Sequence, residues 1–447
     1  MDREVTDKNL NRILTKGWLY RGEGNANVVL SLPSCHKILR IKKCDKPQTI
    51  LQWFLFWIME IFHWDITSDM QQEKRDLDFY NLIMVPLLGS WYTQPAVSIE
   101  TTKGDIKKLE FELANFRPEK RKHKGLKVGM ASIFVDYAFL PTTFNSFCRE
   151  GVTYAVEIKP KKGFMEDDRV IDKCQFCVKQ YLKIKNQQIK KLSSYCPLDL
   201  FSGDTEKICR ALKALISNPQ NNLRIFCNGV YYYGENTSQD KFYTMLNELF
   251  ECSDNDLINH FCALVTRALL KASPLNRNCL HCDDAGTETN LPKGCVLERI
   301  LALQKLNRLG VAEYNNVLKK LNKCKSNNFS YVDRLLKKIS SDNEFCPRCT
   351  IEKVILGSEK SQPDDLDLVP YMISAIANDL SLMVTFQKIP KLACEHEDRI
   401  IQVKDLRFFV DIGVFDLYPK PVSTIEKHMK VQMEMETAYM SAMQGSA

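Results

Sequence analysis

The segment Tyr20-Arg-Gly-Glu-Gly-Asn-Ala-Asn27 decides how the N-terminal part of the chain is expected to fold. Val28-Val-Leu30 follows it directly, and after a short break Lys37-Ile-Leu-Arg-Ile-Lys-Lys43 has the β-branched residues of a strand. The sequence therefore predicts two strands joined by a glycine-containing turn, and then a third strand. Because glycine has no side chain, backbone N–H groups of this turn can approach a phosphate. The turn is not a P-loop, since no Gly-Lys-Ser/Thr follows and a strand, not a helix, comes next.

The order strand, glycine-rich turn, strand is how protein-kinase-like folds cover the phosphates of a nucleotide. In such a fold Arg40, on the third strand, would face these phosphates. Two other interpretations fit this stretch as well: the turn is an ordinary hairpin, and Arg40 is a solvated charge on an edge strand.

The composition is that of a globular protein. Of the 447 residues, 45% are hydrophobic and 26% are charged, which excludes wholesale disorder, collagen-like and low-complexity proteins. The length predicts two or three domains, or two lobes that share a cleft. The net charge of +7 is small, so the placement of the basic residues tells more than their number.

The first residues, the cysteine count and the most apolar stretch indicate where in the cell the protein is expected. Met1-Asp-Arg-Glu-Val5 carries charges and no apolar core, so we expect no secretory signal, and the 17 cysteines are too few for a disulfide framework. The most apolar stretch, Ile50 to Trp64, contains Gln52 and Glu60 and is shorter than the roughly 20 residues of a membrane span. We therefore predict a soluble protein of the cytoplasm or nucleus with reduced thiols and no membrane partner.

Basic residues gather after residue 153. Tyr154 to Phe164 is predicted to be a strand on which Glu157, Lys159 and Lys161 share one face, because side chains alternate along a strand. A helix predicted from Asp167 to Lys191 carries Lys179 and Lys183 four residues apart on one face. Such groups suit a polyphosphate, and the alternative is a solvated charged face. We do not expect nucleic-acid binding, since RNA-binding aromatic motifs and a groove-reading helix are missing.

Two acids far along the chain complete the candidate chemistry. Asp379 follows a predicted helix (Asp364 to Asp379) and precedes a predicted strand (Leu380 to Lys388), and Asp416 ends another strand (Arg407 to Asp416). Carboxylates at strand ends can hold a magnesium ion or accept a hydroxyl proton. Either aspartate alone would more often be a turn or cap residue.

These segments together resemble inositol-pentakisphosphate 2-kinases, the enzymes that make inositol hexakisphosphate. The strings that carry the resemblance are Tyr20-Arg-Gly-Glu-Gly-Asn-Ala-Asn27, Val156-Glu-Ile-Lys-Pro-Lys161, Tyr195-Cys-Pro-Leu-Asp-Leu-Phe-Ser-Gly203, Gln220-Asn-Asn-Leu-Arg-Ile-Phe226 and Asp416-Leu-Tyr-Pro-Lys-Pro421. They span nearly the whole chain, and Glu-Ile-Lys-Pro-Lys is the most specific of them.

The resemblance implies an α+β, two-lobed fold distantly similar to protein kinases, with ATP bound between the lobes. We accordingly expect an N-terminal lobe at residues 1–136, a hinge at 137–153 and a C-terminal lobe at 154–435. Residues 436–447 are expected to be a frayed tail.

The resemblance also implies roles for individual residues. Asp379 would be the base for the 2-hydroxyl, Lys159 would hold the transferred phosphoryl group, and Asp416 would bind magnesium together with Asp379. The implied nucleotide contacts are Gly22, Glu23, Gly24, Asn25, Ala26, Asn27, Arg40, Asp136, Tyr137, Glu157, Arg224, Met383 and Asp416. The implied inositol-phosphate contacts are Arg121, Lys161, Lys179, Lys183, Asn221 and Lys420.

The chain departs from the family at three places. Plant members carry a second arginine shortly after the position of Arg40, where Asp45 intervenes in this chain. A histidine is usual where Lys179 stands, and Thr424 and His428 occupy the positions of an arginine and a tyrosine that plant members use. Those last contacts are therefore not transferred to this chain.

The resulting expectation is a monomeric kinase that uses ATP and Mg²⁺ to phosphorylate the axial 2-hydroxyl of inositol 1,3,4,5,6-pentakisphosphate. The lobes are expected to close when Arg121 meets the substrate. Two alternatives remain: an inositol-polyphosphate kinase of other site selectivity, and a non-catalytic scaffold that binds polyphosphate or RNA.

Three Cys-x-x-Cys pairs raise the question of zinc: Cys174/Cys177, Cys279/Cys282 and Cys346/Cys349. Two such pairs can build a tetrahedral site, and the second and third pairs are the favoured set. The alternative is that these are unbonded buried thiols. The first pair lies in the predicted substrate helix and is the least favoured as a metal site.

Overall fold

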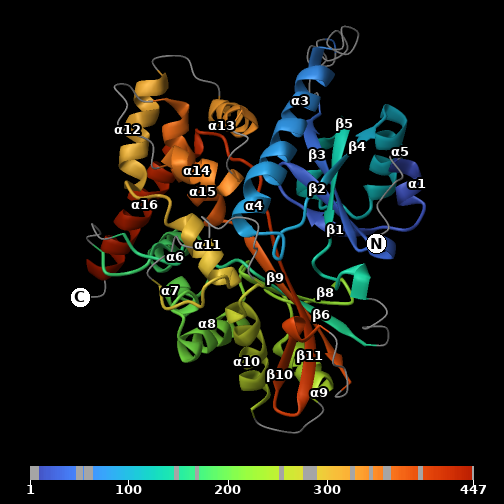
Figure 1. Ribbon diagram of the computed structural model, residues 1–447, viewed down its shortest axis with the longest axis vertical. Helices are drawn as coiled ribbons and strands as arrows, with labels where there is room; N and C mark the ends of the chain where they lie inside the picture. Colours follow the sequence, from blue (N-terminus) through green and yellow to red (C-terminus); the bar gives the residue numbers. More distant parts are fainter. Residues whose placement is uncertain are drawn as a thin grey trace.

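A computed structural model describes residues 10–46, 54, 64–144, 151–166, 171–250, 256–274, 289–322, 328–341, 346–355, 364–390 and 396–444. Two antiparallel sheets form its framework, one built from the first part of the chain and one from the rest (Figure 1). Most of the helices lie beside the second sheet and beside the gap between the two (Figure 1). This is the α+β class that the sequence predicts.

The first sheet has five strands in the order β1-β2-β3-β5-β4. Their bounds are β1 (Leu19–Glu23), β2 (Asn27–Leu32), β3 (Lys37–Asp45), β4 (Val97–Thr101) and β5 (Lys124–Val135). One face packs on α1 (Leu10–Leu14) and α5 (Lys103–Leu113) through a core that includes Val28, Leu39 and Ile133. The predicted pair of strands around the glycine turn is therefore confirmed as β1 and β2.

The second sheet has six strands in the order β10-β11-β9-β6-β7-β8. Their bounds are β6 (Thr153–Ile158), β7 (Leu223–Cys227), β8 (Val230–Tyr233), β9 (Ser381–Ile389), β10 (Ile400–Val403) and β11 (Leu406–Phe415). β6 and β9 are central and buried on both faces, as near-continuous apolar runs require. The strands predicted before Asp416 and after Asp379 are confirmed as β11 and β9.

Helices fill the remaining described chain. Their bounds are α3 (Trp64–Phe79), α4 (Val85–Leu88), α6 (Gln175–Lys185), α7 (Pro197–Leu200), α8 (Thr205–Ser217), α9 (Gln239–Phe250), α10 (Leu257–Leu270), α11 (Val296–Gln304), α12 (Gly310–Asn322), α13 (Ser330–Ser341), α14 (Pro347–Ile355), α15 (Val369–Ala377) and α16 (Thr424–Gln444). A π-helical turn, Tyr80–Met84, joins α3 to α4, and short 3-10 helices lie at Pro33–Cys35, Glu119–Arg121, Thr142–Phe144, Asp365–Leu368 and Glu397–Arg399. Within the described ranges, none of the helices combines the length and the apolar character that crossing a bilayer demands.

The basic strand is shorter than predicted. β6 ends at Ile158, so Lys159 and Lys161 lie in the extended segment after it. Lys159 still pairs with the neighbouring chain, its N–H donating to the Asn222 carbonyl at 2.9 Å. Pro160 has no N–H to continue the ladder, and Lys161 has a left-handed φ of 63°, which ends the alternation.

The predicted helix from Asp167 to Lys191 was too long. α6 begins at Gln175, where Cys174 caps it, and its last turn leads into Gln187 at a φ of 54°. Residues 167–170 lie outside the described part. The helix still carries Lys179 and Lys183.

The expected frayed tail from residue 436 is also wrong for the described residues. α16 continues to Gln444, and Met435 and Ala438 are only 1% and 5% exposed. The apolar contacts of these two side chains hold the end of the chain against the fold.

Arg21 on β1 connects the two sheets. Its guanidinium donates to the Gly229 carbonyl in the β7–β8 turn and to the carboxylate of Asp136, and it lies 4.9 Å from the ring centroid of Phe226. Val414 of β11 adds a second connection, its N–H donating to the Tyr92 carbonyl at 2.8 Å. The sheets are thus joined at defined points beside the segment that follows β5.

Candidate functional site

The centre of the candidate site is a carboxylate held between two lysines. Lys161 Nζ lies 3.0 Å from Asp379 Oδ1, and Lys420 Nζ lies 3.1 Å from Asp379 Oδ2. The Asp379 side chain is 59% exposed, so the group faces solvent. Burial alone would raise the pKa of Asp379, but the two ammonium groups outweigh it and hold the pKa well below its usual range.

Buried backbone contacts fix this geometry. The fully buried Gln304 donates from its side-chain amide to the Lys161 carbonyl at 2.8 Å and to the Ala377 carbonyl at 3.1 Å. It therefore ties the segment of Lys161 to the end of α15, two residues before Asp379. On the other side, Tyr331 Oη donates to the Lys420 carbonyl at 2.9 Å.

Helix α6 brings two more lysines to the same place. Desolvation, followed by repulsion from Lys161, lowers the pKa of Lys179, and Asp379 opposes that shift. Desolvation and then repulsion from Lys179 and Lys161 lower the pKa of Lys183. The side chain of Lys179 is exposed, so the like charges around it act at the surface of the protein. The four predicted substrate lysines are thus gathered into one group.

Helix α16 contributes two residues that the sequence analysis did not assign. Lys427 and His428 both interact electrostatically with the group around Asp379. Burial, then Lys420 and Lys179, lower the pKa of His428 to about 4, and its Nδ1 lies 2.9 Å from Tyr371 Oη. The sequence places both residues within one helical turn of Thr424, but only the tertiary structure shows that this face of the helix points toward Asp379. We call Lys161, Lys179, Lys183, Lys420, Lys427 and His428 the cation cage.

Beside the cage lies a second group with balanced charge. Lys159 Nζ is 3.8 Å from Asp416 Oδ2, and Arg224 Nη1 is 3.6 Å from Glu157 Oε2. Ser381 Oγ lies 3.4 Å from both carboxylates, which connects them. Burial raises the pKa of Glu157, while Arg224 and Lys159 lower it. We call these five residues the acid pair site.

The acid pair site has the donors that a hard cation prefers. Carboxylate oxygens of Glu157 and Asp416 and the hydroxyl of Ser381 converge, and oxygen ligands are those that Mg²⁺ takes in proteins. Asp416 has a φ of 66°, an unfavourable conformation for a residue with a side chain, which places its carboxylate directly at the end of β11. Asp379 is paired with the cage lysines instead, so the structure assigns the two predicted magnesium aspartates to different groups.

The glycine turn is fixed by buried ion pairs. Glu23 accepts from Arg117 at 2.9 Å and from Lys43 at 2.7 Å, and these partners offset burial and lower its pKa to about 2. Its carboxylate is thus committed to holding the turn. Arg121 donates to the side chain of Asn25, so this predicted substrate residue lies against the turn and not in the cage.

Arg40 is positioned beside the turn. Its guanidinium stacks over Tyr418 at 4.3 Å from the ring centroid. With the side-chain oxygen of Asn27 turned toward it, Arg40 donates to that oxygen from Nε at 3.1 Å and from Nη2 at 2.9 Å. Gly22 has a φ of 146°, which a residue with a side chain rarely adopts, and a Cβ at Gly24 would meet nothing within 4 Å. The turn therefore leaves room above its backbone.

The predicted hinge segment forms the edge of a small apolar cluster. Tyr137, Ala138, Ala155, Phe226 and Met383 are buried together, with Val135 and Phe415 packed against them. Apolar and aromatic side chains of this kind suit an adenine ring. The carboxylate of Asp136 is not available to a ligand, because it accepts from Arg21, from Ser31 Oγ at 2.5 Å and from the Ala138 N–H at 3.1 Å. Any contact of Asp136 with a nucleotide would have to use its backbone.

The remaining predicted residues are placed as follows. Asn221 is exposed just before β7, next to Asn222, which pairs with Lys159. Cys279 and Cys282 lie outside the described residues. Cys346 and Cys349 are close, with their sulfurs 3.3 Å apart. Among the described residues, a three-cysteine group occurs elsewhere, at Cys174, Cys177 and Cys196.

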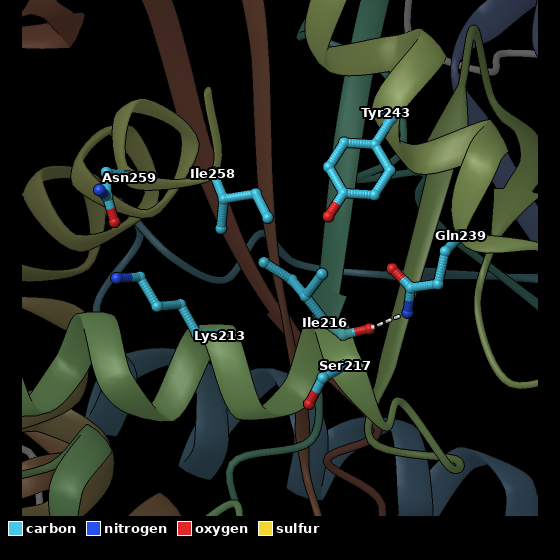
Figure 2. Close-up of a pocket in the computed structure, with 7 residues that line it drawn as sticks. All are labelled: Lys213, Ile216, Ser217, Gln239, Tyr243, Ile258 and Asn259. Atoms are coloured by element: carbon cyan, nitrogen blue, oxygen red, sulfur yellow. Dashed lines mark hydrogen bonds between the residues drawn. The ribbon is translucent and has the colours of Figure 1, made fainter. Parts of the chain in front are cut away.

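The chain also has a hollow away from this site. Figure 2 shows its lining: Lys213, Ile216, Ser217, Gln239, Tyr243, Ile258 and Asn259, around a volume of about 590 Å³. Gln239 Nε2 donates to the Ile216 carbonyl at 3.0 Å across its edge (Figure 2). Its described lining residues include one lysine and no carboxylate, so these residues lack the groups for phosphoryl transfer.

The sequence is similar to known proteins along most of its length. A family model described as inositol-pentakisphosphate 2-kinase matches residues 20–434. The chain is 25% identical to an inositol-pentakisphosphate 2-kinase of Danio rerio, over 97% of this chain and 95% of that protein. It is 26% identical to the enzyme of that name from Arabidopsis thaliana, over 94% of this chain and 93% of the relative.

Proposed function

The chain belongs to the inositol-pentakisphosphate 2-kinase family, and on that premise we propose that it transfers the γ-phosphoryl group of ATP to the axial 2-hydroxyl of inositol 1,3,4,5,6-pentakisphosphate. The product is inositol hexakisphosphate. The observation that carries the proposal is the cation cage around Asp379, since it combines one exposed carboxylate with positive groups from four separate segments.

The charge of the cage matches the charge of the substrate. Five phosphates carry roughly −8 to −10 at neutral pH. Two lysines pair with the exposed carboxylate of Asp379, and Lys179, Lys183 and Lys427 add further positive charge, so the described residues of the site carry excess positive charge before substrate binds. Each close pair with a phosphate contributes about 1 to 4 kcal/mol, depending on the local dielectric. A substrate with few phosphates would leave the lysines repelling one another.

Because Asp379 is paired with two lysines, its ability to accept a proton depends on whether substrate is bound. In the free protein Lys161 and Lys420 hold its pKa so low that it is a weak proton acceptor. Substrate phosphates compete for the same two ammonium groups, and moving those lysines onto phosphate lets the pKa of Asp379 rise toward a useful range. Asp379 then accepts the proton of the 2-hydroxyl while the oxygen of that hydroxyl forms a bond to the γ-phosphorus of ATP. The bond between this phosphorus and the leaving ADP breaks.

The acid pair site and the glycine turn would hold the nucleotide. Glu157 and Asp416 would hold Mg²⁺, which neutralises charge on the nucleotide phosphates when bound. Lys159, between this site and the cage, would stabilise the transferring phosphoryl group, together with Arg40. The apolar cluster of Tyr137 and Met383 would receive the adenine. Positioning and charge neutralisation supply most of the catalysis in phosphoryl transfer.

We further infer a two-lobed arrangement distantly similar to protein kinases, with the first sheet as the N-terminal lobe. Support comes from the glycine turn of that sheet and from the hinge-like segment after β5. Arg121 lies against Asn25 on the N-terminal side, so reaching the cage requires the lobes to close. Because every proposed site residue comes from one chain, a monomer suffices.

The direct test incubates the full chain with Mg²⁺, ATP and inositol 1,3,4,5,6-pentakisphosphate. Anion-exchange chromatography and phosphorus NMR should find inositol hexakisphosphate as the single product. Lys338→Ala, an exposed position on α13, is the matched control and should keep full turnover. Phosphorylation of another isomer in preference would point to a kinase of other selectivity, and tight binding without turnover to a scaffold.

A further inference from the structure

Three cysteines that the proposed reaction does not use meet behind the cation cage. The sulfur atoms of Cys174, Cys177 and Cys196 all lie within 4.8 Å of one another, and Cys174 is buried. Cys174 and Cys177 are at the start of α6, and Cys196 immediately precedes α7. The sequence favoured other cysteines, because the third thiol is 19 residues from Cys177 and belongs to no Cys-x-x-Cys pair.

The spacing of the sulfurs matches metal ligation. Cys174 Sγ and Cys196 Sγ are 3.8 Å apart. Thiolates at a Zn–S distance of 2.3 Å in a tetrahedron are separated by about 3.8 Å. A disulfide needs about 2.0 Å, and thiols that merely pack in a core need no third partner.

The surrounding backbone favours ionised sulfur. The Cys177 N–H donates to Cys174 Sγ at 3.3 Å, the hydrogen bond by which a Cys-x-x-Cys turn supports a metal-bound thiolate.

We propose that Cys174, Cys177 and Cys196 bind one zinc ion through three thiolates, with the fourth position taken by water or a small exogenous ligand. Binding releases the protons of the cysteine thiols as they become thiolates, and the zinc keeps its charge, so the step involves no oxidation. The site goes beyond the kinase reaction and does not depend on it.

The position of the site gives it a structural consequence. Cys174 caps the helix that carries Lys179 and Lys183, so a metal there fixes the start of that helix. Tyr195, next to Cys196, donates from its buried hydroxyl to the Pro160 carbonyl at 2.7 Å, between Lys159 and Lys161. Zinc would thus hold two of the four segments that form the cage, α6 and the segment of Lys161, at one point. Loss of the metal is expected to weaken pentakisphosphate binding.

The test is the metal content of the full chain, purified under reducing conditions without chelator. Plasma mass spectrometry should find about one zinc per chain, and X-ray absorption should find about three sulfurs around it. Titration of the wild-type protein with a mercurial should release the zinc as three thiols react, a measurement that needs no variant to fold. Cobalt exchange should give the near-ultraviolet thiolate-to-cobalt band.

Variants locate the site. Cys196→Ser should bind less than a fifth of the wild-type zinc and lose pentakisphosphate affinity about tenfold by calorimetry without ATP. Cys346→Ser should keep both. Zinc retained in Cys196→Ser and lost in Cys346→Ser would overturn the proposal, as would wild-type protein with neither zinc nor a cobalt band. A disulfide between Cys174 and Cys196 in metal-free protein would overturn it too. Kinase activity enters none of these readouts.

Discussion

The acid pair site and the cation cage are neighbours, but charge is balanced in the first and mainly positive in the second. In the acid pair site each carboxylate has a basic partner, Glu157 with Arg224 and Asp416 with Lys159. In the cage two lysines share the carboxylate of Asp379, and Lys179, Lys183 and Lys427 add further positive charge, of which Glu235 offsets a part near Lys183. The difference matches the ligand proposed for each group. The balanced charges of the acid pair site suit a nucleotide whose charge a metal offsets, and the excess positive charge of the cation cage suits a polyanion without a metal.

The unbalanced cage has a measurable signature in the free protein. Repulsion contributes to the lowered pKa values of Lys179, Lys183 and His428. A polyanion reverses each of these shifts, so its binding should be accompanied by proton uptake. Charge variants on the two sides should then separate binding from turnover.

The largest effect is expected from removing the charge of Asp379. Asp379→Asn should lower kcat about 10³-fold, because general-base contributions are typically 10²- to 10⁴-fold. The same change frees Lys161 and Lys420 from an ion pair, so the Kd for pentakisphosphate should stay equal or fall. Rapid-quench kinetics and calorimetry measure the two quantities. A variant that binds more weakly but retains turnover would show that Asp379 shapes the cage and is not the base.

On the balanced side, Lys159→Ala should lower kcat about 10²-fold with little change in pentakisphosphate affinity. Its ammonium is assigned to charge that develops on the transferring group, and one such donor typically contributes 10²- to 10³-fold. Steady-state kinetics with both substrates varied separates kcat from KM. A large rise in the pentakisphosphate KM at unchanged kcat would move Lys159 from the reaction to the cage.

His428 makes the stability of the free protein dependent on pH. Its folded pKa of about 4 lies below the unfolded value near 6.5, so the unfolded chain takes up the proton first. The contribution of His428 to the free energy of unfolding is fully present above pH 6.5 and is lost as the pH falls to about 4. We expect the loss to be about 2 kcal/mol, allowing for partial solvent access.

Denaturant melts of the wild type and His428→Gln between pH 7 and pH 4 measure that loss. The variant should show a flatter pH dependence over this window, whereas His123→Gln, at an exposed position, should follow the wild type. Equal slopes for all three proteins would contradict the placement of His428 beside the lysines.

The smallest effect is expected from a single cage lysine. Lys183→Ala should raise the Kd for pentakisphosphate about tenfold and leave kcat within about threefold, because the contact proposed for Lys183 is with phosphate and not with the reacting hydroxyl. The salt dependence of binding should also become less steep. If Lys185→Ala, two residues away on the exposed side of α6, changed affinity equally, the assignment of Lys183 would be wrong.

Sequence reasoning predicted the parts of this site that lie in short motifs. Gly22 to Asn27, Glu157 to Lys161 and Asp416 to Lys420 are each local strings, and their strands and turns followed from periodicity. Their convergence followed from the resemblance and not from the pattern. It depends on tertiary contacts, such as Gln304 between Lys161 and Ala377, for which no local signal exists.

The errors have physical reasons of the same kind. Pro160 and the left-handed Lys161 end a strand whose side chains would otherwise continue to alternate. The segment of Asp136 and Tyr137 stays a predicted nucleotide contact, but the carboxylate of Asp136 accepts from Arg21 and Ser31, which the sequence does not reveal. His428 and Cys196 could not be identified, because their partners arrive from other elements. A rule based on sequence spacing detects ligands within one turn, such as Cys174 and Cys177, but not a third ligand from a distant loop, such as Cys196.

The contacts of Arg21 limit how the molecule can move. A side chain anchored at once to the Gly229 carbonyl, the Phe226 ring and Asp136 cannot slide without losing all three. Opening and closing of the cleft would therefore be a rotation about a pivot at this end, with the widest travel at the far rim. Arg21→Ala should leave both halves folded but free to translate, so that the enzyme would bind each substrate and seldom align them.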